Sequence, residues 1–260
     1  MIEYTFTYGE LETFLLIFVR IASFIFVAPF IGNRAVPNRT KIGFALILTF
    51  LLFDNVSRGV LDYNTVLGYG VIVLKEVLTG MLIGFSFMIC NLLASFAGYI
   101  VDMQIGLSMV SLFDPNSNEQ ITISGSLYQQ VVMIMLIISG MYQYILRALV
   151  DSYTMVPING AVFQTDKLVQ SIIDFIGAFI IIGFRIAMPV FIVTLILNVI
   201  LGVLAKVSPQ LNMFAVGMQI KILLGLAILY LTAGMLYGAS DFVFNEMKIL
   251  LHQFMDGMVA

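Results

Sequence analysis

Two long apolar runs restrict the possible folds of this chain more than any other feature. The runs Val66–Val101 and Ser171–Val207 are each far longer than the roughly 20 residues that a helix needs to cross a bilayer. The run Ile42–Phe53 is too short, since as a helix it spans about 18 Å against a hydrocarbon core of roughly 30 Å. Pro189 predicts a kink or break in the second long run. The other apolar runs are Thr13–Ile31, Leu127–Leu149 and Met213–Gly238. We therefore expect an all-α, membrane-associated chain of helical hairpins with broken helices, and not a simple series of spans.

The composition agrees with a chain that buries much apolar surface. Of its 260 residues 61% are hydrophobic and 10% are charged, whereas soluble domains are about half apolar and a quarter charged. Such a chain enters a bilayer or lies in a large apolar assembly. A net charge of -3 with scattered basic residues gives no surface for nucleic acid.

Several charged residues stand inside the apolar runs. An ionised group at a helix centre that faces lipid costs about 2.5–3.5 kcal/mol, so we expect these faces to meet protein or a wet cavity. Buried pairs or a proton-responsive network are one interpretation. We favour the other, in which the charges satisfy carbonyls of broken helices or meet charges on partner subunits. The residues predicted to act as buried charges in assembly are Arg20, Lys75, Glu76, Arg185 and Lys221.

An apolar loop is predicted after Asp102. From Asp102 to Ser126 the chain contains no Lys or Arg, yet it carries apolar residues such as Met103 and Leu107. A loop that faces water is polar, so we expect this one to be enclosed. A methionine-bearing apolar segment can close a pore by expelling water, and a re-entrant loop buried for packing explains the pattern equally well. We interpret Asp102 and Asp114 as helix boundaries or caps, not as a carboxylate pair for a proton relay.

Two glycine pairs have the spacing that lets helix backbones approach closely. They are Gly80 with Gly84 and Gly234 with Gly238. Such pairs are common in apolar sequences, so we favour helix packing within this chain over a special dimer interface.

The C-terminal residues follow an amphipathic pattern with helical spacing. We expect a helix over 239–260 that lies on a membrane interface, docks on a partner or packs on its own domain. The apolar positions are Val243, Met247, Leu250, Leu251, Phe254 and Met258.

Groups for catalysis are lacking in the sequence. His252 is the only histidine, so histidine metal pairs and Ser–His triads have no second member. Cys90 lies in an apolar run and is interpreted as core filler. No phosphate-binding glycine loop is present. We expect no catalytic residue, no metal site, no cofactor and no enzymatic activity.

Three separated motifs occur in a characteristic order over nearly the whole chain. They are Arg20 with Ala28–Arg39 and Lys41, then Gly98–Pro115, then Asn198–Phe214 with Gly217 and Lys221. Together they resemble the FliR family, the R subunit of the flagellar type III secretion export gate. The pair Asp114–Pro115 and the run Ser208–Asn212 favour the flagellar branch over the related injectisome gate subunits.

The resemblance implies a place in a multi-subunit channel. Members of the family join several P and Q subunits in a helical, mostly α-helical hetero-oligomer at the base of the flagellum, with a B subunit around the entrance and an A subunit below. Unfolded flagellar proteins pass through the centre, driven chiefly by the proton-motive force. The resemblance also implies contact with membrane lipids and a location in the bacterial inner (cell) membrane, in the flagellar basal body. Much of the complex lies above the membrane plane, which would explain the unusual span lengths.

The resemblance also implies a plug, because the segment matching Gly106–Asn118 projects into the channel in that family. Residues Asn116–Gln120 are more polar than those before them, so we place the gate in Met103–Phe113 and interpret the rest as a stalk. The predicted gate residues are Met103, Gln104, Gly106, Leu107, Ser108, Met109, Val110, Leu112 and Phe113.

The predicted organisation has three parts. Residues 1–126 form a P-subunit-like part with the plug loop at about 103–118. Residues 127–238 form the remaining hairpins, including a Q-subunit-like part, and residues 239–260 form the C-terminal amphipathic helix. The expected function is that of a structural and gating subunit of the flagellar export channel. The alternatives are a self-sufficient multi-pass transporter or channel, and the equivalent subunit of a virulence injectisome.

Overall fold

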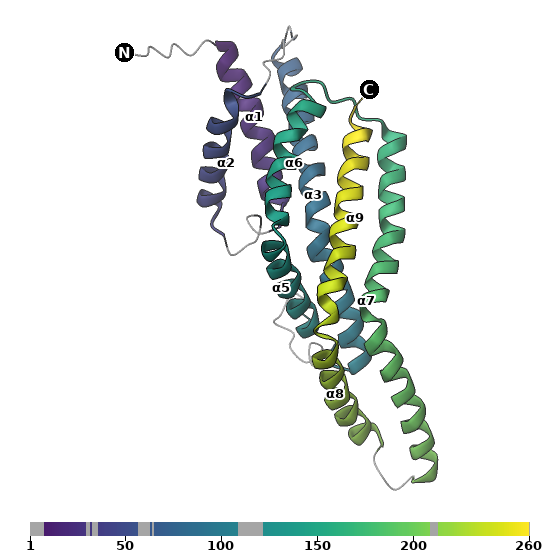
Figure 1. The fold of residues 1–260 in the computed structure, drawn as a ribbon. Coiled ribbons are helices and arrows are strands. Elements are labelled where there is room, and N and C mark those ends of the chain that lie inside the picture. Colours follow the sequence, from purple (N-terminus) through teal and green to yellow (C-terminus); the bar gives the residue numbers. More distant parts are fainter. Residues whose placement is uncertain are drawn as a thin grey trace. The chain divides into compact units, whose positions relative to one another are not determined.

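The computed structural model describes residues 8–29, 32, 36–56, 63, 65–108, 122–208 and 213–259. In this part of the chain helices are the only regular elements (Figure 1), which confirms the all-α prediction. The helices are α1 (Tyr8–Val27), α2 (Asn38–Phe53), α3 (Val66–Ile105), α5 (Ile123–Ile138), α6 (Met141–Met155), α7 (Thr165–Val207), α8 (Met213–Thr232) and α9 (Met235–Gly257).

The two long apolar runs each form one long helix, α3 with 40 residues and α7 with 43. Helix α7 continues through Pro189 without interruption, so no break occurs there. A proline inside an apolar helix removes one backbone hydrogen bond. Helix α7 tolerates that loss, because several complete helical turns lie on each side of Pro189.

The run Leu127–Leu149, by contrast, is divided where no break was predicted. Helix α5 ends at Ile138 and α6 begins at Met141. Between them Gly140 has a φ of 70°, a left-handed conformation that glycine adopts without the steric cost of a Cβ.

By length and composition, two helices of the described chain, α3 and α7, can each cross a membrane. The number rises to four if α5 with α6, and α8 with α9, each form one bent span. Within its apolar window α7 is only 22% buried, against 56% for α3. Most of the apolar surface of α7 is therefore left for lipid or for another protein.

The chain forms two compact units, which we describe separately. Unit 1 comprises Met1–Ile89, Gly140–Phe175 and Glu246–Ala260. In it α1 packs on α2, where the rings of Phe14 and Phe50 lie 4.9 Å apart.

The glycine pair Gly80 and Gly84 brings α3 against α1 in unit 1. A Cβ at Gly80 would overlap the carbonyl oxygen of Arg20, and one at Gly84 would lie 2.9 Å from that of Phe24. This pair therefore packs within the chain, as predicted.

The C-terminal part of α9 completes unit 1. Phe254 is fully buried and lies 6.3 Å from Phe85, centroid to centroid. Backbone hydrogen bonds join Val162 to Met258 (3.0 Å) and Gln164 to the carbonyl of Gly257 (2.9 Å). The six apolar positions predicted for the amphipathic helix are all buried, so of the three alternatives the structure shows packing on the chain's own core.

Unit 2 comprises Cys90–Ser139 and Ile176–Asn245. Its core is built around α3, where Phe96 stacks on Phe179 of α7 at 4.8 Å and occupies the space above Gly183. Ile105 fills the corresponding space at Gly225 of α8. Unit 2 therefore positions the end of α3, where the predicted gate begins.

Candidate functional site

The predicted gate begins inside a helix. Because α3 extends to Ile105, Met103 and Gln104 belong to its last turn and not to a loop. Gly106 follows with a φ of 92°, and its N–H donates to the backbone carbonyl of Asp102 at 3.0 Å, an arrangement typical of a helix C-terminus. Of the other predicted gate residues, Leu107 and Ser108 follow α3, while Met109, Val110, Leu112 and Phe113 lie outside the described residues.

Asp102 caps α5, the next described helix along the chain. Its carboxylate accepts hydrogen bonds from the backbone N–H of Ser124, at 3.0 Å to Oδ2, and from the Ser124 hydroxyl. Thr122, at the N-cap position of α5, makes no capping bond of its own. A carboxylate satisfies unpaired N–H groups at a helix N-terminus and is favoured by the helix dipole. The predicted boundary at Asp102 is thus wrong for α3, which continues to Ile105, but the predicted cap is present on α5.

Two further contacts join α3 to α5. Gln129 donates to the hydroxyl of Ser95. Gly98 lies so close to Gly125 that a Cβ on it would overlap the backbone of α5. Positions 95, 98 and 102 share one face of α3, because they are spaced by three and four residues. This face, which we call the loop clasp, holds together the two ends of the segment that contains the predicted gate.

Removal of the Asp102 carboxylate tests the loop clasp. The side chain is 1% exposed, so Asp102→Ala leaves the Ser124 N–H and hydroxyl buried without their acceptor. We expect a destabilisation of about 2 kcal/mol, measured as a lower apparent Tm of the detergent-solubilised protein. The exposed Asp151→Ala is the control, with an expected change within about 0.5 kcal/mol. Equal Tm values for the two variants would contradict the clasp.

A second group of functional candidates lies in unit 1, around a buried ion pair. Arg20 of α1 and Glu76 of α3 are both fully buried, and Nε of Arg20 lies 2.5 Å from Oε2 of Glu76. The other carboxylate oxygen accepts the backbone N–H of Asn159 at 3.0 Å. Both carboxylate oxygens are therefore used, as a buried carboxylate requires.

Arg20 also caps the C-terminal end of α6. Its Nη1 donates to the carbonyl of Val156 at the C-cap (2.8 Å) and to that of Ser152 (3.3 Å), which also accepts the backbone N–H of Val156. The guanidinium carbon lies 4.4 Å from the ring centre of Tyr153. One side chain thus connects α1, α3 and α6.

The other charged residues predicted for assembly are not brought into this cluster. Lys75 and Lys221 are partly exposed, and Arg185 is exposed. Within the described ranges none of the three forms an ion pair, whereas Arg20 and Glu76 do. The sequence offered no signal for which charges would pair, because the partners lie far apart in the chain.

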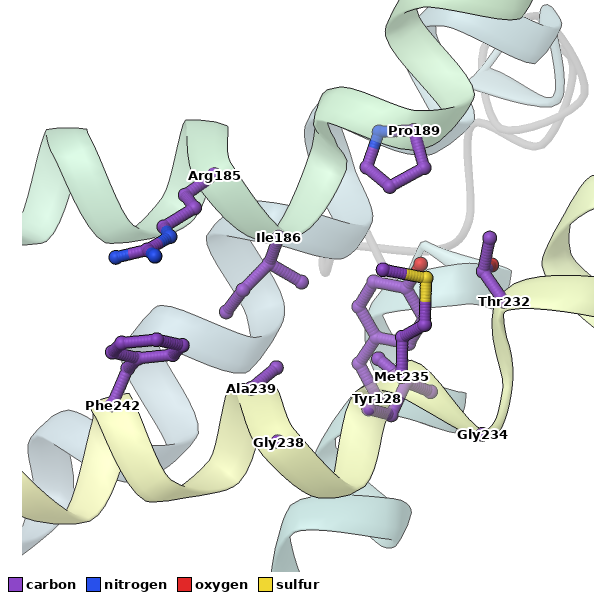
Figure 2. A pocket seen from close by; sticks show the side chains of 11 residues that line it. Tyr128, Arg185, Ile186, Pro189, Thr232, Gly234, Met235, Gly238, Ala239 and Phe242 are labelled. Atoms are coloured by element: carbon purple, nitrogen blue, oxygen red, sulfur yellow. The ribbon is translucent and has the colours of Figure 1, made fainter.

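A cavity in unit 2 was not anticipated from the sequence. Its volume is about 470 Å³, and it lies between α7 and the break that separates α8 from α9 (Figure 2). Arg185 is at one end, with its guanidinium carbon 4.0 Å from the ring centre of Phe242. Gly234 was the available signal, because it lies in the turn between α8 and α9. The lining residues are Tyr128, Arg185, Ile186, Pro189, Thr232, Gly234, Met235, Leu236, Gly238, Ala239 and Phe242.

No group of three or more His, Cys, Asp or Glu side chains that could hold a metal ion occurs among the residues the structure describes. Cys90 is buried in α3 at 1% exposure. The arrangement offers buried polar anchoring, helix packing and an open, largely apolar cavity.

Comparison with known proteins extends these observations over most of the chain. The family described as bacterial export proteins, family 1, matches residues 11–247. The flagellar biosynthetic protein FliR of Aquifex aeolicus (strain VF5) is 29% identical over 225 residues, which cover 85% of each chain. The FliR protein of Bacillus subtilis (strain 168) is 26% identical over 237 residues, covering 89% of this chain and 90% of the relative. That of Escherichia coli (strain K12) is 24% identical over 234 residues, with coverages of 90% and 88%.

Proposed function

This chain belongs to the bacterial export proteins of family 1, and from that membership we propose that it is the R-type subunit of a flagellar protein export gate. The observation that carries the proposal is the family match over residues 11–247, with relatives named for flagellar biosynthesis that align over most of their length. The exposed apolar surface of α7 supports a subunit that is completed by other chains.

The proposed complex has several components around this subunit. The partners are the P and Q gate subunits, with a B subunit at the entrance, an A subunit below and lipids of the bacterial inner membrane around it. Its cargo is unfolded flagellar protein. In this proposal the N-terminal part corresponds to a P subunit and the C-terminal part includes a Q-like hairpin. The subunit needs no catalytic activity of its own.

The proposed mechanism is steric and hydrophobic closure of the channel by the segment Met103–Phe113. An apolar constriction excludes water and ions, and methionine side chains adapt to different passing chains. The loop clasp supports this mechanism, because a segment that fills a pore must be held at both ends. Entering substrate then displaces the segment.

Deletion of the segment Gly106–Pro115 tests the gate. We expect the complex to assemble while its pore becomes permeable to ions, because the apolar constriction has been removed. The measurement is single-channel conductance of the complex in planar bilayers. Replacing Asn116–Gln120 by Gly and Ser residues of equal number is the control, and it should leave the pore closed.

Two results would count against the proposal. A deletion complex whose pore stays tightly closed would overturn the gating role. A wild-type chain that is stable and binds substrate when produced without P and Q subunits would favour a self-sufficient transporter instead. Complementation of a flagellar rather than an injectisome mutant would distinguish the two secretion systems.

A further inference from the structure

Arg185 is an exposed cation near the middle of the apolar helix α7. One face of its guanidinium is covered by the ring of Phe242, as Figure 2 shows. Among the residues that the structure describes, no carboxylate lies within ion-pair distance of Arg185. Its hydrogen-bonding edge is therefore available to an anion that another molecule supplies.

Apart from Arg185 and the hydroxyl-bearing side chains of Tyr128 and Thr232, the side chains that line the adjoining cavity are apolar. Ile186, Pro189, Met235 and Ala239 give it apolar walls. The hydroxyl of Thr232 donates to a backbone carbonyl of its own helix at 2.8 Å, so it is already satisfied. An occupant that fits such a cavity is apolar along its length and carries a negative charge at the end near Arg185.

Two open glycines line this cavity: Gly234 lies in the break before α9, and Gly238 lies in the first turn of α9. A Cβ at Gly234 or Gly238 would meet no heavy atom within 4 Å, although both residues line the cavity. At Gly80, in contrast, the space that a Cβ would need is already occupied by the backbone of α1. The predicted packing of Gly234 and Gly238 within the chain is therefore wrong. A surface of this kind lets the backbone of a further helix approach closely.

We propose that a helix of a partner subunit lies against this surface, fills the cavity with apolar side chains and pairs a glutamate or aspartate with Arg185. A phospholipid is the other source of an apolar body with an anionic end. Helix α7 measures about 65 Å at 1.5 Å per residue, twice the roughly 30 Å of a hydrocarbon core, so lipid cannot cover all of its exposed apolar surface. The open glycine pair favours a helix over an acyl chain at this place.

The inference rests on the proposed function, because it requires a partner subunit. The first test is co-expression of the full chain with the P and Q gate subunits of the same bacterium, followed by affinity purification. Arg185→Glu should lower the recovery of P and Q subunits at least tenfold by placing two negative charges together. Gly238→Leu should do the same by filling the cavity. Arg185→Lys should retain part of the recovery, because it keeps the charge but loses the bidentate geometry.

Two controls separate this effect from unfolding. Gly202→Leu adds the same side chain at another exposed position of unit 2 where a Cβ meets nothing within 4 Å, and it should leave the recovery unchanged. Protease resistance of each variant in membranes reports whether the chain itself is folded, and it should be equal for Arg185→Glu and wild type.

The second test identifies the occupant directly. Met235→p-benzoylphenylalanine places a photo-crosslinker in the cavity wall. We expect an adduct with a P or Q subunit that disappears when Arg185→Glu is added. Wild-type recovery of Arg185→Glu together with an adduct to phospholipid would overturn the inference and leave the proposed function intact. A wild-type chain that recovers neither P nor Q subunit would overturn both.

Discussion

Replacement of Arg20 by methionine should destabilise the protein by about 3–5 kcal/mol, because it leaves the fully buried carboxylate of Glu76 without its counter-charge. The same change removes the donor to the carbonyls of Ser152 and Val156 at the end of α6. The measurement is the apparent Tm of the detergent-solubilised protein, followed by loss of its monodisperse peak in size-exclusion chromatography. In the proposed gate, Arg20→Ala should lower the yield of assembled complex more than it alters conductance.

A second substitution distinguishes the ion pair from simple loss of packing. The double variant Arg20→Met with Glu76→Leu removes both charges, and we expect it to recover much of the stability lost in the single variant. Lys75→Met is the control, since Lys75 is the neighbouring residue of α3, is partly exposed and forms no ion pair in the described structure. If the double variant is no more stable than Arg20→Met alone, the pair is not the source of the effect.

Replacement of Gly98 by alanine should cost about 3 kcal/mol, at the upper end of the range for overpacking. The added methyl group would overlap the backbone of Gly125, and backbone cannot move aside as a side chain can. Helices α3 and α5 would have to separate, which also weakens the hydrogen bonds between Asp102 and Ser124. A lower apparent Tm measures the effect.

The same chemical change elsewhere should have the opposite sign. Gly202→Ala lies inside α7, where a Cβ meets no atom within 4 Å, so alanine should stabilise the helix by about 0.5–1 kcal/mol. If Gly98→Ala and Gly202→Ala shift the Tm in the same direction, close approach of α3 and α5 is not what requires glycine at position 98.

The apolar runs predict the long helices well, because hydrophobic continuity is a property of each segment by itself. Both long runs form single helices, α3 and α7. The division between α5 and α6 was missed, since its one local signal is Gly140, and a single glycine does not by itself end a helix. Of the kink or break predicted at Pro189, the break does not occur, because a helix this long tolerates one lost hydrogen bond.

The contacts of the candidate site depend on residues that are distant in the chain, and this limits what a sequence predicts. The charges at Arg20 and Glu76 were recognisable as costly in apolar surroundings, but their pairing depends on how α1 meets α3. Asp102 was recognisable as a cap or boundary, whereas Ser124 as its partner follows from the return of the chain through α5. The gate roles of all the predicted residues stay predictions, and residues 109–113 also lie outside the described residues.

Unit 1 is assembled from three stretches that are widely separated in the chain, and the last of them supplies Phe254 and Met258 to its interior. During synthesis on the ribosome, α1 and α2 emerge long before these residues exist. Part of the interior between the early helices therefore stays unfilled until residues 246–260 have been synthesised. Over that interval the nascent chain depends on the insertion machinery or on chaperones to cover it, and a shortened transcript would leave unit 1 open to quality-control proteases.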